Sequence, residues 1–150
     1  MTVSSDSVLL LAQVMLGAAL TGIIWLVQVV IYPQFLNVGA AEFSRYHFRH
    51  KLGITMIIVP LMLIEMGLAC LAVWWFRQSS IALLSLVATL MTVGVWASTA
   101  FIQVPLHQAL ERERSESTIC RLTNTNWIRT VLWSVRLVLL TWAMISWRGQ

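Results

Sequence analysis

Charged residues are scarce in this sequence. Only 11% of the 150 residues are Asp, Glu, Lys or Arg, whereas an ordinary soluble domain has about a quarter. Apolar residues make up 59% of the chain, and its mean hydropathy is +0.80. A soluble domain of this size could not cover its surface with so few polar groups, and a disordered chain needs low hydrophobicity and high charge. The composition therefore indicates an integral membrane protein, with the lipid bilayer as its first partner.

Cysteine is also rare, and several catalytic motifs are missing. The two cysteines, Cys70 and Cys120, fall at different predicted membrane depths, so we expect neither a disulfide nor a redox pair. No Cys-x-x-Cys, Walker motif, dinucleotide-binding fingerprint or nucleophile elbow occurs. The net charge of +4 is ascribed to membrane orientation, and no nucleic-acid partner is predicted.

Long apolar runs are what the chain has instead. A helix needs about 20 apolar residues to cross the hydrocarbon core. Four stretches qualify, at about 8–31, 52–76, 81–102 and 127–147. Because backbone groups in lipid must be hydrogen bonded and these runs are continuous rather than alternating, each is predicted to be a helix. The prediction is one all-α domain over residues 1–150, a four-helix transmembrane bundle.

The ends of the spans are predicted from breaking residues and from the polar loops. Tyr32-Pro33 is expected to end the first span and Pro105 the third. The second helix is expected to begin near Ala41, just after Gly39, and to project beyond the membrane. From 106 to 122 we expect a short helix, a Ser/Thr break over 115–118, and a return to the membrane.

Basic residues are distributed unevenly between the loops. The side that holds the connections between spans one and two and between spans three and four carries Arg45, Arg49, Lys51, Arg112, Arg114 and Arg121. The opposite side carries Arg77 and Arg148. Because cytoplasmic loops are enriched in Lys and Arg, we expect both long loops in the cytoplasm and both termini outside it. The predicted location is a bacterial inner membrane, with the first span retained because no cleavage site follows it.

The first and third spans share a pattern. Thr21, Trp25, Gln28 and Pro33 occur in the same order as Thr92, Trp96, Gln103 and Pro105. Two duplicated helical hairpins would explain this order and would place a site between the two halves of the chain. Chance similarity within an apolar sequence of low complexity explains it equally well.

Two charges fall inside the predicted spans. At 1.5 Å per residue, Glu65 lies roughly 20 Å and Arg136 roughly 14 Å from the inner boundary. A buried carboxylate is costly unless it is neutral or paired, so Arg136 is the predicted partner of Glu65. The pair could merely fix helix register. Alternatively, Glu65 could handle protons or anchor a substrate, or it could be protonated without a partner.

All three histidines are predicted at the inner face. His47 and His50 are three residues apart and share a helix face, while His107 lies at the other inner boundary. Three imidazoles could hold a transition metal (iron, copper or zinc), with Glu42 and Glu111 completing the ligand shell. Alternatively, one histidine could act as an acid–base or hydrogen-bonding group, or all three could simply lie in the headgroup zone.

Short motifs across most of the chain resemble a group of membrane proteins. They are Tyr32-Pro33-Gln34-Phe35, Tyr46-His47 with His50, Gln103-Val104-Pro105-Leu106-His107, and Asn126-Trp127-Ile128-Arg129-Thr130 with Trp133 and Arg136. The pattern is similar to small four-helix bacterial membrane proteins of unknown function and, more loosely, resembles the anthrone-oxygenase-like membrane proteins. The second resemblance implies oxidation of a flat polycyclic phenol by molecular oxygen, with His47, His107, Asn126 and Arg129 as site residues.

The leading hypothesis is a membrane-embedded oxidoreductase or oxygenase that acts on a hydrophobic small molecule at the cytoplasmic face. His47, His50 and His107 would bind a metal or move protons, while Asn126 and Arg129 would orient the substrate. The alternative is a non-enzymatic scaffold or accessory subunit, either as a homo-oligomer or within a larger membrane complex. A small transporter is a third hypothesis, although the outer halves of the spans are too apolar to supply a polar path.

Overall fold

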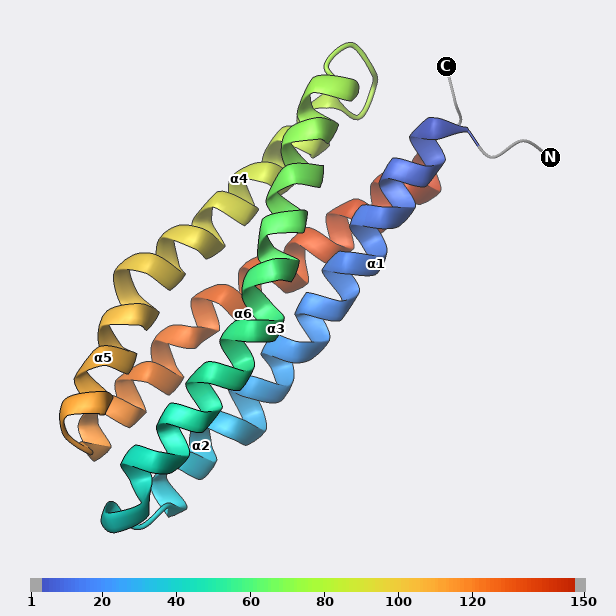
Figure 1. Ribbon diagram of the computed structural model, residues 1–150. Coiled ribbons are helices and arrows are strands. Elements are labelled where there is room, and N and C mark those ends of the chain that lie inside the picture. The colour runs from blue at the N-terminus through green and yellow to red at the C-terminus, as the bar shows by residue number, and fades with distance from the viewer. Residues whose placement is uncertain (1–3, 148–150) are drawn as a thin grey trace.

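Four long helices form a bundle in the computed structural model, which describes residues 4–147 (Figure 1). Their continuous helical segments are Ser5–Asn37, Ala40–Trp75, Ala82–Arg112 and Glu116–Ser146. Each segment is long and apolar enough to cross a membrane. The predicted all-α four-helix bundle is therefore confirmed.

The helices run up and down, and neighbours in the chain are neighbours in space. The main helices are α1 (Ser5–Leu26), α3 (Ala40–Trp75), α4 (Ala82–Ser98) and α6 (Glu116–Ser146). α1 packs against α3, α3 against α4, α4 against α6, and α6 closes the bundle against α1. The short connections at 38–39 and 113–115 lie at one end, and the turn between α3 and α4 lies at the other (Figure 1).

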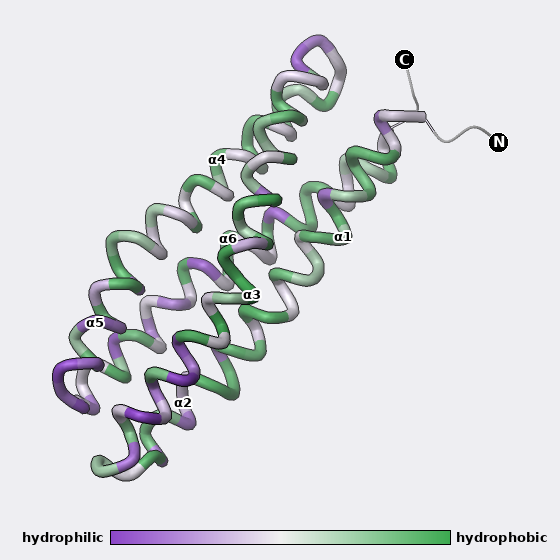
Figure 2. The backbone as a smooth tube through the Cα atoms, viewed as in Figure 1, coloured by the Kyte–Doolittle hydropathy of each residue, from purple (hydrophilic) through white to green (hydrophobic). Residues whose placement is uncertain are grey.

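Charge and hydropathy divide the bundle along its length. The end that carries the connections at 38–39 and 113–115, here called the basic end, holds most of the hydrophilic positions, and the rest of the chain is largely apolar (Figure 2). Large apolar side chains are exposed along the bundle, as at Leu63, Phe101 and Val138. Such a surface suits lipid rather than water. Of the two cations predicted for the opposite side, Arg77 follows α3, and Arg148 lies outside the described residues.

The sequence predicts that the first and third spans end at their prolines, but both helices continue past them. The first continues through η1 (Val27–Ile31), α2 (Tyr32–Gln34) and η2 (Phe35–Asn37), and the third through η3 (Thr99–Gln103) and α5 (Val104–Arg112). Both helices therefore extend beyond the predicted span ends at Tyr32-Pro33 and Pro105.

A π-helical turn before each proline explains why the helix continues. In η1 the N–H of Tyr32 bonds to the carbonyl of Val27, five residues back, and in η3 the N–H of Val104 bonds to the carbonyl of Thr99. In a regular α-helix, a proline ring clashes with the carbonyl four residues earlier. The wider turn relieves this clash, because it changes the position of the preceding carbonyls relative to the ring.

The two π-helical turns lie at equivalent places in the first and third helices. Positions 27 and 31 precede positions 99 and 103 by 72 residues, and Pro33 precedes Pro105 by the same interval. The Thr–Trp pairs of the repeated sequence pattern are offset by 71 residues (21 and 92, 25 and 96). The structure thus adds a shared backbone feature to the repeat, and duplication of a hairpin stays a prediction.

The polar ends of the second and fourth helices lie beyond the apolar runs. α3 begins at Ala40 with Gly39 as its N-cap, which confirms the predicted start. α6 begins at Glu116 rather than near 127, because hydropathy marks only the apolar part of a longer helix. Its N-cap is Ser115, whose side chain accepts a hydrogen bond from the N–H of Thr118 at 3.4 Å. The break therefore falls at 113–115, earlier than the predicted 115–118.

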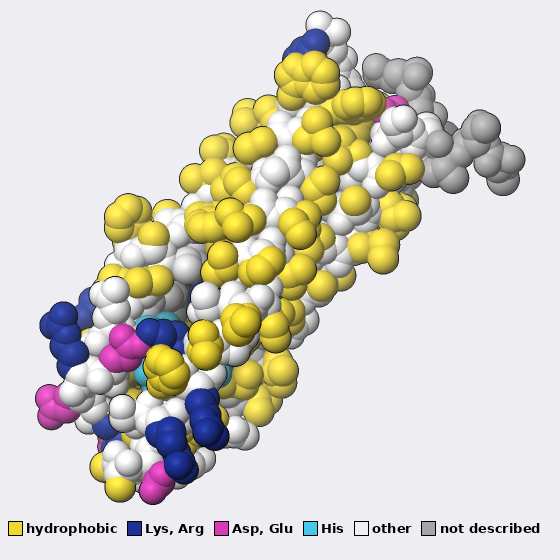
Figure 3. All heavy atoms as spheres, viewed as in Figure 1, with side chains coloured by type: hydrophobic (Ala, Val, Ile, Leu, Met, Phe, Trp, Pro, Cys, Tyr) yellow, Lys and Arg dark blue, Asp and Glu magenta, His cyan; other side chains and the backbone are white. Residues whose placement is uncertain are grey.

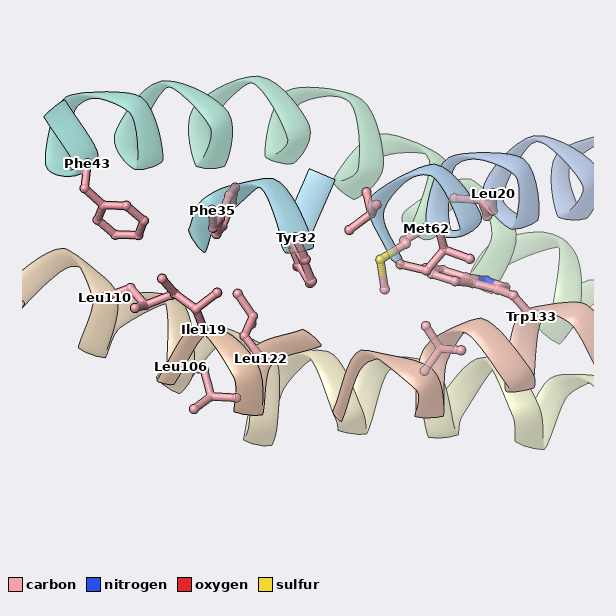
Figure 4. Packing of buried hydrophobic residues seen from close by; sticks show 13 residues of the cluster. Leu20, Tyr32, Phe35, Phe43, Met62, Leu106, Leu110, Ile119, Leu122 and Trp133 are labelled. Atoms are coloured by element: carbon pink, nitrogen blue, oxygen red, sulfur yellow. The ribbon is translucent and has the colours of Figure 1, made fainter. Parts of the chain in front are cut away.

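Buried apolar side chains form two clusters. The larger cluster fills the basic half of the bundle, where Phe35 and Phe43 lie near Leu110 and Leu122 (Figure 4). The smaller cluster fills the opposite end and includes Leu10, Phe76 and Ala143. In Figure 4, Tyr32 is separated from Met62 and Trp133 along the bundle axis. All three residues line a cavity.

Candidate functional site

A cavity of about 280 Å³ lies inside the basic half of the bundle. All four long helices contribute apolar walls, which include Ile24, Val27, Ile54, Ile58, Met62, Val104 and Trp133. The polar lining includes Tyr32, Thr99, Gln103, His107 and Arg129. An apolar pocket with a few convergent polar groups is the usual form of a small-molecule site. Ligand pockets span about 300–1,000 Å³, so this cavity suits a compact molecule rather than a two-chain lipid.

Arg129 places a buried positive charge on the cavity wall. It is 7% exposed, and its Nε donates to Asn126 Oδ1 at 2.9 Å. Its other donors reach the Tyr32 hydroxyl at 3.3 Å and Thr99 Oγ1 at 3.5 Å. Among residues 4–147, no Asp or Glu forms an ion pair with Arg129. Because buried charges are normally paired, the site would favour a ligand that brings a negative charge to this guanidinium.

The orientation of Asn126 is fixed by the first helix. Asn126 is fully buried, and its Nδ2 donates to Gln28 Oε1 at 2.8 Å. Thr130 donates to the same oxygen at 3.3 Å, while Gln28 Nε2 donates to the carbonyl of Thr123 at 3.0 Å. Since the amide nitrogen of Asn126 is engaged by Gln28, its oxygen faces Arg129. Asn126 and Arg129, both of which the sequence predicts as site residues, are therefore held in a fixed relative orientation.

Two of the three histidines belong to a continuous hydrogen-bonded chain. The Tyr32 hydroxyl lies 3.0 Å from His107 Nε2, and His107 Nδ1 lies 2.9 Å from His47 Nε2. The chain of contacts therefore runs from Arg129 through Tyr32 and His107 to His47. It connects α6, the segment after η1, α5 and α3, in that order.

His50 is close to this chain but not part of it. Its ring centroid lies 6.4 Å from that of His107 and 6.2 Å from that of Tyr32. No group in the part of the chain that the structure describes hydrogen bonds to the buried His50 Nε2. The structure thus brings His47 and His107 into direct contact and leaves His50 beside them.

The donor set predicted for a metal ion is not assembled. Across residues 4–147, no group of three or more His, Cys, Asp or Glu side chains is placed to hold a metal ion. The two glutamates predicted to complete the ligand shell are both paired with cations. Glu111 forms an ion pair with Lys51, and Glu42 forms one with Arg45 at 3.4 Å.

The cavity reaches the outer surface between α3 and α5. Its lining includes residues that are exposed on the outside of these helices, namely Thr55 and Val59 of α3 and Val104 and Gln108 of α5. The Lys51–Glu111 ion pair joins the two helices at the mouth. Figure 3 shows histidine side chains between basic and acidic ones near the basic end, so the polar interior is visible from outside.

Glu65 and Arg136 form the ion pair that the sequence predicts. Arg136 Nη1 lies 3.0 Å from Glu65 Oε1, and both side chains are 1% exposed. Trp133 Nε1 also donates to the carboxylate at 3.1 Å, and Arg136 Nη2 donates to Gln13 Oε1 at 3.2 Å. A Cβ atom at Gly17 would lie 3.3 Å from Arg136 Nη1, so glycine leaves room for the guanidinium. Trp133 lines the cavity as well, and thus links it to the ion pair.

The sequence marks Tyr32 only as the predicted end of the first span and as part of a short motif, and it assigns this residue no role. Tyr32 is 3% exposed, whereas Tyr46, the other tyrosine, is 38% exposed. The sequence marks Gln28, which orients Asn126, only as part of the repeated pattern. Gln28 lies within the π-helical turn η1, and Tyr32 follows it directly. The nearby Pro33 is the one feature of the sequence that could have indicated this turn.

Comparisons with known proteins leave the site to be interpreted from its own geometry. No protein-family model, curated protein or solved structure matches this chain.

Proposed function

We propose that this membrane protein binds a compact hydrophobic molecule that carries an acidic oxygen. The observation that supports this most directly is Arg129, a buried cation without a carboxylate partner in residues 4–147, on the wall of a largely apolar cavity. Buried charges in proteins are normally paired with a charge of opposite sign. An oxyanion on the ligand would therefore supply the missing charge, and the apolar walls would hold its body.

The surroundings of the mouth support a ligand that arrives from the bilayer. The exposed side chains beside the opening include Val59 and Val104, which belong to the apolar outside of α3 and α5. A hydrophobic molecule dissolved in lipid reaches this mouth without crossing water. Lys51 lies at the same mouth, where it would attract an anionic group from the headgroup region.

Oxidation by molecular oxygen is the reaction that the sequence resemblance adds to this proposal. A flat polycyclic phenol has the hydrophobic body and weakly acidic oxygen that the cavity suits. We expect oxygen uptake by nanodiscs that contain the protein and an anthrone, and we expect His107→Ala and Arg129→Gln to reduce it. Uptake no greater than that of empty nanodiscs would favour the accessory-subunit hypothesis.

Binding of an anion and its neutral analogue tests the role of Arg129. We expect 2-naphthoate to bind to the protein in lipid nanodiscs more tightly than 2-naphthamide, as measured by calorimetry against empty nanodiscs. Loss of a charged hydrogen bond predicts that Arg129→Gln weakens naphthoate binding by about tenfold to a hundredfold and changes naphthamide binding little.

Arg121→Gln is the matched control, because Arg121 is an exposed arginine on the same helix. It removes one positive charge without touching the cavity, so naphthoate binding should not change. Equal affinities for naphthoate in the native protein and in a folded Arg129→Gln variant would contradict the proposal.

A further inference from the structure

We propose that Tyr32, His107 and His47 form a proton relay that takes a proton from the bound molecule and delivers it to His47. The inference rests on the proposed function and deepens it, because it names the group that accepts the proton and the class of molecule that needs one. Tyr32 and His107 line the cavity, whereas His47 is fully buried behind them. The relay therefore leads away from the ligand into the protein.

Arg129 sets the direction of the hydrogen bonds. A guanidinium has only donors, so Arg129 Nη2 donates to the Tyr32 oxygen at 3.3 Å. The single hydroxyl hydrogen of Tyr32 then points to His107 Nε2 at 3.0 Å. Since a neutral imidazole has one N–H and one acceptor nitrogen, His107 carries its hydrogen on Nδ1 and donates it to His47 Nε2 at 2.9 Å. His47 then carries its hydrogen on Nδ1.

The proton transfer balances along this chain. The O–H bond of the ligand breaks, and its proton moves to the Tyr32 oxygen as the original Tyr32 proton moves to His107 Nε2. The proton on His107 Nδ1 moves at the same time to His47 Nε2. Tyr32 and His107 end neutral, His47 becomes an imidazolium, and the ligand becomes an oxyanion beside Arg129. No electron is transferred, and no other reactant is required.

Burial disfavours a charge on His47, and the aromatic face of Phe43 offsets part of that cost. The ring of Phe43 stacks on His47 with centroids 5.5 Å apart and an interplanar angle of 11°. Aromatic faces attract cations within about 6 Å of the ring centroid. His47 Nδ1 has no hydrogen-bond partner among residues 4–147, so no further group continues the relay beyond His47.

The relay indicates which class of acid the site takes. A carboxylic acid is ionised at neutral pH before it binds, so it needs no base. A phenol or an enol keeps its proton at that pH and loses it only to a positioned acceptor beside a stabilising cation. The combination of Tyr32 and Arg129 therefore favours a flat hydrophobic phenol over a fatty acid.

Deprotonation of a bound phenol tests the relay. The probe is 2-naphthol, whose neutral and deprotonated forms absorb at different wavelengths, added to the protein in nanodiscs at a pH where the free probe is neutral. We expect a deprotonated fraction in the native protein that falls about tenfold in Tyr32→Phe, while total binding is retained. The matched control is Tyr46→Phe, which alters the only other tyrosine and should change nothing.

Nitrogen NMR of labelled histidine gives a second readout that needs no ligand. The chain has only three histidines, so single substitutions identify each signal. In the free protein we expect His47 and His107 to be protonated on Nδ1, and with bound naphtholate we expect His47 to be protonated on both nitrogens. A hydrogen on His107 Nε2 in the free protein would overturn the relay, as would a neutral His47 beside bound naphtholate.

The two readouts separate failure of the relay from failure of the proposed function. If neither naphthoate nor naphthol binds, the proposed function is wrong, and the relay falls with it. If naphthoate binds through Arg129 but the deprotonated fraction of naphthol is the same in the native protein and in Tyr32→Phe, only the relay is wrong.

Discussion

Arg129 and Arg136 are buried arginines on the same helix, and their partners differ in charge. Arg136 contacts the carboxylate of Glu65, whereas Arg129 contacts the neutral oxygens of Asn126, Tyr32 and Thr99. A charge that is already balanced has no electrostatic reason to recruit a ligand. At the residue scale, the bundle therefore contains one arginine balanced by a carboxylate and one whose partners among residues 4–147 are all neutral.

Removal of Arg136 should destabilise the protein strongly. Arg136→Met leaves the Glu65 carboxylate buried and unpaired, which is expected to cost about 3–5 kcal/mol of unfolding free energy. Glu65→Gln removes that charge and keeps an oxygen for Trp133, so the double variant should lose much less than the sum of the two single losses. Unfolding in mixed micelles measures the three variants.

Additive losses in this cycle would contradict direct pairing. Binding of 2-naphthoate to the folded fraction of each variant is the control, and it should stay near the native value if the pair serves packing alone.

Much of the candidate site could be predicted residue by residue. The sequence singled out His47, His107, Asn126 and Arg129, and the structure brings all four into one hydrogen-bonded group with Tyr32. What it could not supply was the side-chain direction, because a polar residue near a helix end can face lipid headgroups or the interior equally well. His50 shows this, since it shares a helix face with His47 but its Nε2 atom has no hydrogen-bond partner among residues 4–147.

At the scale of helices, the π-helical turns decide where the first and third helices direct their side chains. η1 and η3 each precede a proline, and Val27, Thr99 and Gln103 within them line the cavity. Turns of this type are frequent at functional sites. Hydropathy cannot reveal them, because the residues of a π-helical turn have no distinctive composition. The sequence alone therefore predicts that the spans end near the prolines and gives no sign that the helices continue.

The wide turn and Pro33 should depend on each other. Deletion of Val30, which is partly exposed in η1, would turn the wide turn into a regular α-helical one. Pro33 would then clash with a preceding carbonyl, at an expected cost of about 3 kcal/mol. Thermal unfolding in nanodiscs measures this loss.

Pro33→Ala in the same deletion variant should restore most of the stability. If the deletion variant with Pro33 intact is as stable as the native chain, the two features are independent.

At the scale of the whole molecule, the number and order of the helices could be predicted almost completely. Four apolar runs in a chain of 150 residues leave few arrangements other than an up-and-down bundle. The extents of the helices could not be predicted as well, because α3 and α6 extend past the apolar runs into polar sequence. That extension forms the basic end, where the mouth of the cavity lies.

The excess of basic residues at that end predicts the orientation of the bundle. In a variant without Cys70 and Cys120, a single cysteine introduced as Ser79→Cys should react with a membrane-impermeant maleimide in intact cells. One introduced as Ser117→Cys, at the basic end, should react only after the cells are permeabilised. The reverse pattern would place both termini in the cytoplasm.

The opening of the cavity between α3 and α5 has a consequence for how affinity should be expressed. A ligand that enters from lipid is in equilibrium with its mole fraction in the bilayer rather than with its concentration in water. Doubling the lipid at constant total ligand would then halve the occupancy of a weak site, although the protein and its contacts are unchanged. Dissociation constants for this protein should therefore agree between preparations only when they are given per mole of lipid.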